Sequence, residues 1–384
     1  MQKGKTYFDT SLLTYIILII IFSCIALQSA QKYAPGDINF LKKQIIWFII
    51  SGVLILIIFY FDFDSIMKLT PYIYSLGILL LIFVLLAPDS IAPEIKGAKS
   101  WILVPGLGSM QPSEFMKIFL ILMLSYRATK HSEKYTTGVI GSDIKLLLQM
   151  GIIAGLPMGL TLLQNDFGTT LVMFIISLGI IFTAGINYKL VISVVITLTI
   201  IVFLLIITFL YDPNILLNLL DPYQLDRINS WLDPFGHAQG IGYQLKQSIV
   251  AIGSGTMYGK GYDMSNVYTP ETHTDFIFTI VGEELGFLGG SLLIVLYFLI
   301  IYRTIRIALY SNFFESFICT GIISLLTFHV FQNIGMVIGL IPITGIPLPL
   351  MSYGGSSVMS TMIGLGLILN ISLKKKQYMF SKDD

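Results

Sequence analysis

Charged residues are scarce in this chain of 384 residues, and that shortage excludes an ordinary soluble fold. Only 12% of the residues are Asp, Glu, Lys or Arg and 55% are hydrophobic, whereas about a quarter of the residues of a soluble domain are charged. The net charge of +1 also argues against a nucleic-acid partner, which would require a basic surface. This composition is typical of a polytopic membrane protein.

The chain also has only two cysteines, and it lacks histidine clusters and nucleotide-binding motifs. Cys24 and Cys319 both lie in apolar runs and are expected to be small buried hydrophobic residues, without a disulfide. The four histidines do not have the spacing of a zinc site, so no metal site is predicted. The absence of GxxxxGK[ST] and GxGxxG motifs argues against an ATP-driven pump.

Long apolar runs, in contrast, fill most of the chain, and ten of them approach the length of about 20 residues at which a helix crosses a bilayer. We therefore predict an all-α polytopic membrane protein with ten transmembrane helices, forming a single domain over residues 1–384. The first run follows Lys3 and Lys5 as a signal peptide would, but we interpret it as an uncleaved helix. The ten runs are 11–29, 43–61, 70–88, 112–127, 145–164, 168–185, 189–210, 275–302, 315–340 and 356–373.

The distribution of Lys and Arg predicts the orientation of these helices. Most of the 23 basic residues fall in segments that are cytoplasmic if the N-terminus is inside, including the cluster at 374–376. Both termini are therefore expected in the cytoplasm. The long loop 211–274, between helices 7 and 8, is then extracellular, and its mixed apolar and polar sequence predicts short amphipathic or re-entrant helices.

Carboxylates gather where the eighth apolar run begins, in the sequence TPETHTDFIFTIVGEELG at residues 269–286. Asp275 has two interpretations. It is either a carboxylate that stabilises the helix N-terminus, with Thr274 as the cap, or a general base whose basicity is raised by partial desolvation. Glu283 and Glu284 lie deeper and need partners inside the bundle, either in a structural ion pair or facing a cavity.

Further charges lie near the same predicted outer side. Glu114 and Lys117 are i,i+3 neighbours and predict either a local salt bridge or a pair that positions the outer surface. Asp166 occupies a tight turn, where a helix cap is the default interpretation. The outer-side cations are ordinary solvated loop charges when taken singly, but as a group they can bind an anionic headgroup such as a phosphate. They are Lys96, Lys99, Arg227, Lys246 and Lys260.

Several sequence blocks together resemble those of the SEDS family (shape, elongation, division and sporulation), which includes RodA and FtsW. The resemblance covers nearly the whole chain and is carried by KGAKSWI (96–102), QPSE..K (111–117), HTDFIF (273–278) and GIPLPLMSYGGSS (345–357), among others. The chain departs from the family at Asn165, where a proline is common, and at Ser100, where an arginine is common. The sequences GKGY and GMVIGLIPITGIPLPL are more similar to the elongation protein RodA than to the division protein FtsW.

The resemblance implies a peptidoglycan glycosyltransferase of the bacterial cytoplasmic membrane that polymerises lipid II into β-1,4-linked glycan strands at the outer face. The catalytic residue would be Asp275, with Glu114 and Lys117 matching the family's pair in the fourth helix. A class B penicillin-binding protein, other elongation or division machinery, membrane lipids and the nascent strand are the implied partners. The residues expected to bind substrate or to support the site are Lys99, Trp101, Glu114, Lys117, Asp166, Arg227, Lys246, Gln247, Ser248, His273, Ser352, Gly354 and Gly355.

Inversion from an α-linked donor to a β-linked product requires a single displacement with one carboxylate as base. The leaving pyrophosphate requires positive charge, which Lys99, Arg227 or Lys246 would supply, with a divalent cation (Mg²⁺ or Mn²⁺) left open as an addition. The buried charges Glu283, Glu284 and Lys117 also fit a lipid II flippase or an ion-coupled transporter, although carriers keep their sites near the bilayer midplane. A scaffold for other cell-wall enzymes is a third interpretation.

Overall fold

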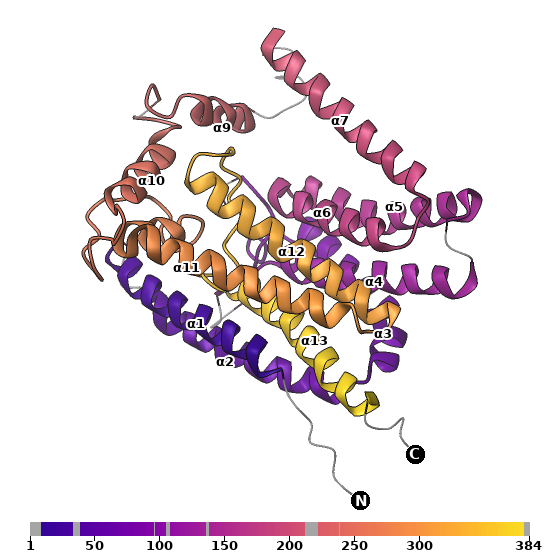
Figure 1. Ribbon diagram of the computed structural model, residues 1–384. Helices are drawn as coiled ribbons and strands as arrows, with labels where there is room; N and C mark the ends of the chain where they lie inside the picture. The colour runs from indigo at the N-terminus through magenta and orange to yellow at the C-terminus, as the bar shows by residue number, and fades with distance from the viewer. Residues whose placement is uncertain are drawn as a thin grey trace, which may run out of the picture.

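The computed structural model describes residues 9–33, 39–95, 97–104, 108–135, 138–211, 222–237 and 239–379, and the candidate cation Lys96 lies outside these ranges. The described residues form twelve α-helices, a short 3-10 helix (η1, Gln31–Tyr33) and one two-stranded sheet. Most of the helices lie side by side in one bundle, as Figure 1 shows. The prediction of a predominantly helical protein is confirmed.

Each of the ten predicted runs forms a helix. Within the described residues, seven of these helices are long and apolar enough to cross a membrane, namely α1, α2, α3, α5, α11, α12 and α13. The number of spans and their orientation remain predictions. The ten helices are α1 (Thr10–Ala30), α2 (Phe40–Tyr60), α3 (Phe63–Leu86), α4 (Pro112–Lys134), α5 (Ile140–Leu163), α6 (Phe167–Thr183), α7 (Tyr188–Tyr211), α11 (Ile277–Ala308), α12 (Phe313–Val337) and α13 (Gly355–Met379).

Local sequence determines where several of these helices begin. Asp9 accepts a hydrogen bond from the amide of Leu12 (3.1 Å) and caps α1, and Asn39 caps α2 in the same way. Asn312 and Glu315 form a reciprocal capping box at the start of α12. Such contacts satisfy amides at the helix N-terminus that have no partner within the helix.

Helices α4, α12 and α13 form the centre of the bundle. Helix α4 packs against α3, α5, α6, α12 and α13, while α13 also packs against α2 and α11. Leu120 of α4, Ile318 of α12 and Leu365 of α13 have no exposed surface. Since lipid is as apolar as these side chains, close packing and polar contacts between helices hold such a bundle together. A charged residue on the inner face of one of these helices therefore needs a partner within the bundle.

The predicted extracellular loop contains two described short helices, α9 (Pro222–Leu232) and α10 (Tyr243–Ser254). The expectation of short helices there is confirmed, while residues 212–221 and 238 of the loop lie outside the described ranges. The loop before α4 forms a hairpin that the sequence did not predict. Its strands, β1 (Ile102–Val104) and β2 (Gly108–Met110), pair antiparallel.

Helix α11 is interrupted, although the sequence predicted a continuous span over 275–302. Gly286 has φ 64° and ψ −160°, a conformation that is essentially restricted to glycine. The loop before α11 satisfies the backbone at this break, because the amides of Lys260 and Gly261 donate to the carbonyls of Glu283 and Glu284 (3.0 Å each). Irregular backbone is tolerated at membrane depth only where the protein itself supplies such partners.

Candidate functional site

Asp275 lies just before α11 and immediately precedes the N-cap residue of that helix. The N-cap residue is Phe276, whose side chain makes no cap hydrogen bond. The predicted cap, Thr274, donates instead to the carboxylate of Glu271 (3.1 Å). The prediction that Thr274 caps this helix is therefore wrong, because the helix begins later than the sequence suggested.

Asp275 and Arg227 meet at one glycine of the loop between α12 and α13. A Cβ at Gly345 would lie 3.4 Å from Oδ2 of Asp275 and 3.8 Å from the guanidinium of Arg227. Gly345 has φ 73°, which favours glycine. Arg227, on α9, donates a hydrogen bond to the carbonyl of Ile343 (2.9 Å). The structure thus brings together a predicted base and a predicted cation that are 48 positions apart in the sequence.

Helix α12 holds the other side of this loop. The ring of His329 contacts the carbonyl of Pro347 through Nδ1 (3.1 Å). The amide of Asn333, one turn further on, donates to the carbonyls of Ile346 and Asp275 (2.8 Å each). Sequence reasoning did not assign a role to either His329 or Asn333. Their polarity inside a predicted span was the available signal, because such residues are costly in a membrane.

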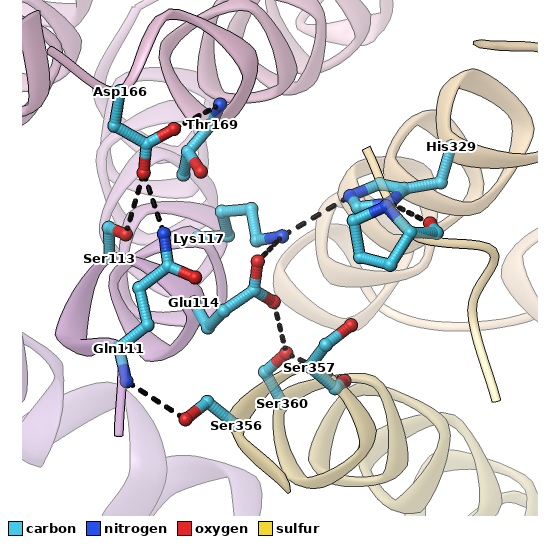
Figure 2. Close-up of polar contacts among 11 residues, drawn as sticks. Gln111, Ser113, Glu114, Lys117, Asp166, Thr169, His329, Ser356, Ser357 and Ser360 are labelled. Carbon is cyan, nitrogen blue, oxygen red and sulfur yellow. Dashed lines mark hydrogen bonds and ion pairs between the residues drawn. The ribbon is translucent and has the colours of Figure 1, made fainter. Parts of the chain in front are cut away.

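A buried ion pair connects α4 to the two neighbouring helices, as Figure 2 shows. Nζ of Lys117 lies 2.8 Å from Oε1 of Glu114, and both side chains are almost fully buried. Nζ also lies 3.2 Å from Nε2 of His329, and Ser360 of α13 donates to the other carboxylate oxygen of Glu114 (3.1 Å). The predicted local salt bridge is confirmed, and it extends to α12 and α13.

The contacts of His329 determine its tautomer. An ammonium group has donors only, so Nε2 of His329 must accept from Lys117. The proton then resides on Nδ1, which donates to the carbonyl of Pro347. A neutral imidazole therefore links the buried ion pair of α4 to the loop that carries Gly345.

Asp166 caps α6, as predicted, and also binds the start of α4 (Figure 2). Its Oδ1 accepts from the amide of Thr169 (3.1 Å), and its Oδ2 accepts from the side chains of Gln111 (2.7 Å) and Ser113 (3.3 Å). Burial raises the pKa of the Asp166 carboxyl, and the hydrogen bonds from Thr169 oppose that shift. The amide of Gln111 donates to Ser356 of α13 (2.9 Å), which ties a third helix to this cluster.

His273 and Ser352 fix the loops around Asp275. The ring of His273 stacks on Phe40 with centroids 4.2 Å apart, and its carbonyl accepts from the amide of Tyr353 (2.8 Å). The hydroxyl of Ser352 accepts from the amide of Leu348 (2.8 Å) and so closes the turn before α13. In the described structure, both residues hold backbone in place.

Gly354 and Gly355 lie where the chain passes close to α2. The amide of Gly354 donates to Gln44 (3.4 Å), and a Cβ at Gly355 would lie 2.5 Å from the ring of Trp47. The absence of a side chain at Gly355 lets α13 approach α2 closely.

The other predicted site residues lie on the loop before α4 and on α10. Lys99 pairs with Asp89 (3.1 Å), and Trp101 is half-buried just before β1. On α10, Lys246 and Gln247 are half-buried, while Ser248 donates to the carbonyl of Val337 (2.5 Å). Lys99 and Ser248 are thus bound to Asp89 and to the last residue of α12, respectively.

The turn at Asn165 differs from the one that a proline would make. Asn165 has φ 59°, a value that the proline ring cannot adopt, and its side chain donates to the carbonyl of Gly97 (3.1 Å). This residue therefore connects the α5–α6 turn to the loop that carries Lys99.

Glu283 and Glu284 are both buried, and both have structural partners. Glu283 pairs with Lys260 (2.5 Å) and also accepts from the amides of Asn266 (2.9 Å) and Val267 (3.2 Å). Glu284 accepts a hydrogen bond from Ser29 of α1. The structural interpretation of Glu283 is confirmed, and Lys260 is accordingly engaged beside α11.

These features define the class of the protein. It is a helical, multi-pass membrane protein with a charged network buried between its central helices and an aspartate–arginine pair beside the loop after α12.

Comparison with known proteins agrees with this class and narrows it. The model of a family of cell cycle proteins, which comprises FtsW, RodA and SpoVE, matches residues 5–377. The chain is 34% identical over 367 residues to stage V sporulation protein E of Bacillus subtilis, covering 94% of each chain. It is 32% identical over 377 residues to the peptidoglycan glycosyltransferase MrdB of Escherichia coli, covering 97% of this chain and 95% of MrdB.

Solved structures show the same similarity. Rod shape determining protein RodA of Thermus thermophilus matches with a TM-score of 0.67 and 26% identity, covering 95% of this chain and 96% of RodA. A structure described as showing the coordination of polymerization and crosslinking by a peptidoglycan synthase complex matches with a TM-score of 0.77 and 26% identity, covering 96% of this chain and 98% of that chain. This chain belongs to the SEDS family, whose curated members include proteins named peptidoglycan glycosyltransferase.

Proposed function

We propose that this protein polymerises lipid II into β-1,4-linked glycan strands at the outer face of the bacterial cytoplasmic membrane. The observation that carries the proposal is that the Asp275 carboxylate and the Arg227 guanidinium both lie within 4 Å of the position that a Cβ at Gly345 would take. The names of its relatives and its similarity to a subunit of a peptidoglycan synthase complex support this reaction class.

The stereochemistry of the reaction requires one carboxylate. The donor is an α-linked disaccharide on undecaprenyl pyrophosphate, and the product bond is β, so the anomeric carbon is inverted once. A single in-line displacement achieves this with one general base, as in inverting glycoside chemistry. Asp275 takes the proton of the acceptor 4-hydroxyl, whose oxygen forms the new bond to C1 of the donor sugar. The bond from C1 to the pyrophosphate oxygen breaks, and the electron pair leaves with the pyrophosphate.

The leaving pyrophosphate carries its charge away without a proton and requires nearby positive charge. Arg227 would supply this charge, and the position of its guanidinium beside the same glycine as the Asp275 carboxylate supports that role. A guanidinium is well suited to bind two phosphate oxygens at once. Lys246 and Lys99, on α10 and the first outer loop, would extend this positive region along the lipid-linked substrate.

A divalent cation would bind mainly through the substrate. Within the described residues, no group of three or more His, Cys, Asp or Glu side chains is arranged to hold a metal ion. Mg²⁺ retains several waters and binds through few protein carboxylates together with substrate phosphates. Such an ion would add positive charge at the pyrophosphate, and the residues of the chain would still supply the base.

The buried pair of Glu114 and Lys117 supports the site in this proposal. Its ammonium contacts His329, which donates to Pro347 in the loop that carries Gly345. Movement of α4 would therefore change the position of that loop. A transporter would use similar buried charges, but carriers place them at a substrate site near the midplane. Here the carboxylate has Lys117 and Ser360 as partners, which favours a structural role.

We further propose the elongation branch of the family as the role of this protein. Its GKGY and GIPLPL sequences and its structural similarity to RodA support that role. Complementation of a rod-shaped bacterium depleted of its own RodA or FtsW tests the branch. Restored elongation is expected, and restored division alone would assign the chain to the other branch.

The partner in this proposal is a class B penicillin-binding protein, a transpeptidase with a single transmembrane helix. Its docking face is proposed on α11 and α12, where Phe287, Leu292, Phe298 and Phe331 are more than half exposed. The partner's helix would bind there by close packing. The similarity to a complex that coordinates polymerization and crosslinking supports the pairing, and co-purification tests it.

The orientation in this proposal has both termini in the cytoplasm and the segment 211–274 outside, within one domain that spans residues 1–384. The decisive experiment for the function is polymerisation of labelled lipid II by the purified protein, with and without the partner transpeptidase. Glycan strands are expected, and their absence under both conditions, with folded protein, would refute the proposed function.

A further inference from the structure

Asn333 is a fully buried polar residue whose side chain contacts the backbone of Asp275, and the reaction proposed above does not yet use it. It belongs to α12, has no exposed surface, and gives both of its amide hydrogens to backbone carbonyls, those of Asp275 and Ile346 (2.8 Å each). These contacts determine the orientation of the amide. The opposite rotamer would place its oxygen against two carbonyl oxygens, which cannot donate.

The contact with Asp275 holds the peptide group that directly precedes α11. The carbonyl of Asp275 belongs to the peptide group that joins this residue to Phe276, the N-cap residue of α11. Asn333 satisfies that carbonyl, while the amide of Phe276, at the other end of the same peptide, donates to the carbonyl of Glu271 (3.2 Å). Because a peptide group is planar, fixing both ends fixes the backbone next to the Asp275 side chain.

The contact with Ile346 connects the same amide to the loop that carries Gly345. Ile346 follows Gly345 directly, and the loop is held on its other side by the hydrogen bond from Arg227 to Ile343 (2.9 Å). The Asn333 side chain therefore sets the distance between the backbone of Asp275 and the loop to which Arg227 is hydrogen-bonded. An error in that distance would move the base relative to the acceptor hydroxyl.

We propose that Asn333 is a positioning residue for glycosyl transfer, which holds the Asp275 carboxylate and the Gly345 loop in fixed register by bridging their backbones. The inference rests on the proposed function, in which Asp275 is the base. Displacement of a reacting group by about 1 Å can reduce turnover by about 10²-fold. Replacement of Asn333 is therefore expected to lower the rate of polymerisation more than it lowers the affinity for lipid II.

The test compares Asn333→Ala with Gln332→Ala in purified protein, using labelled lipid II. Gln332 is a matched control, because it is the preceding residue of α12, is buried, and donates its hydrogen bond to a side chain of the same loop, the hydroxyl of Thr344 (3.0 Å). We expect Asn333→Ala to reduce kcat by about 10–100-fold with little change in KM, and Gln332→Ala to stay close to the wild type. Equal turnover in the two variants would overturn the inference.

A second comparison separates positioning from a loss of active protein. A misfolded fraction would lower the rate of any background by the same factor, whereas a residue that acts through Asp275 has nothing left to position once the base is removed. Asn333→Ala is therefore combined with Asp275→Asn. We expect the double variant to be as slow as Asp275→Asn alone, and a further decrease equal to that of the single Asn333→Ala variant would show a merely structural role.

Asn333→Asp decides the question if the alanine variant does not fold. It has the same shape and leaves no cavity, but it has at most one donor for the two carbonyls. It is expected to fold and to turn over slowly, and wild-type turnover would overturn the inference. Failure of the proposed function is distinguishable, because then the wild type makes no glycan, or Asp275→Asn is as fast as the wild type.

Discussion

Asp275→Asn is the substitution that tests the proposed base most directly. It replaces one carboxylate oxygen by an amide of nearly the same size, and it leaves the backbone contact with Asn333 unchanged. The cap position of α11 belongs to Phe276, and Asn stabilises a helix N-terminus about as well as Asp does. The loss of stability should therefore be smaller than the about 0.5–2 kcal/mol that removal of an N-cap costs.

The loss of activity should be much larger. Removing a general base reduces turnover by about 10²–10⁴-fold, which corresponds to about 3–5 kcal/mol in the activation free energy. The measurement is the initial rate of glycan formation from labelled lipid II, together with the thermal unfolding temperature in the same detergent. An Asp275→Asn protein that is folded and makes glycan strands at the wild-type rate would refute the assignment of the base.

Glu283→Gln is the control for this experiment. Glu283 is fully buried and pairs with Lys260 at the break in α11, so neutralising it leaves a partly buried ammonium group without its partner. An unsatisfied buried group costs about 1–3 kcal/mol, more when it is charged. This variant should lose stability and activity together, which is the opposite of the pattern expected for Asp275→Asn.

Three further outcomes are expected. Lys117→Met should destabilise the protein by about 3–5 kcal/mol, because it leaves the buried Glu114 carboxylate without its cation. The double variant, Glu114→Gln with Lys117→Met, should recover much of that loss. Equal unfolding temperatures for the single and double variants would contradict this expectation. Gly345→Ala should reduce turnover, since a left-handed backbone costs other residues about 1–2 kcal/mol and the added methyl would lie 3.4 Å from Asp275; unchanged kinetics would argue against the placement of the base. Tags at the N-terminus and after Lys376 should report the cytoplasm and a tag near Gly240 the outside, and a cytoplasmic signal at Gly240 would place Asp275 on the wrong face.

Much of the helical architecture could be predicted from the sequence because it depends on local properties. The length of each apolar run and the polar residues at its ends indicated all ten long helices. The cap at Asp166 and the pair of Glu114 and Lys117 were also local, since the residues involved are three positions apart. The start of α11 was harder to predict from the sequence, because Thr274 is a residue type that often caps helices but here bonds to Glu271 instead.

Other features depended on how distant segments pack. Gly286 gave no sign that it interrupts α11, because the partners of the broken backbone come from the preceding loop. Asp275 and Arg227 are separated by α10 and its flanking loops, and only the fold brings them to Gly345. The sequence shows that Asn333 is a polar residue inside an apolar span, where burial of its amide costs free energy. It does not show which carbonyls the amide binds, because both acceptors come from other segments of the chain.

The sequence by itself determined the class of protein, because composition, the length of apolar runs and short motifs are properties of neighbouring residues. Tertiary structure alone decided the partners of the buried polar groups. Lys117 and His329 are 212 positions apart, and nothing in either segment specifies the other. A buried charge must be paired wherever the packing of helices leaves a partner, and that packing depends on the shapes of all the helices together.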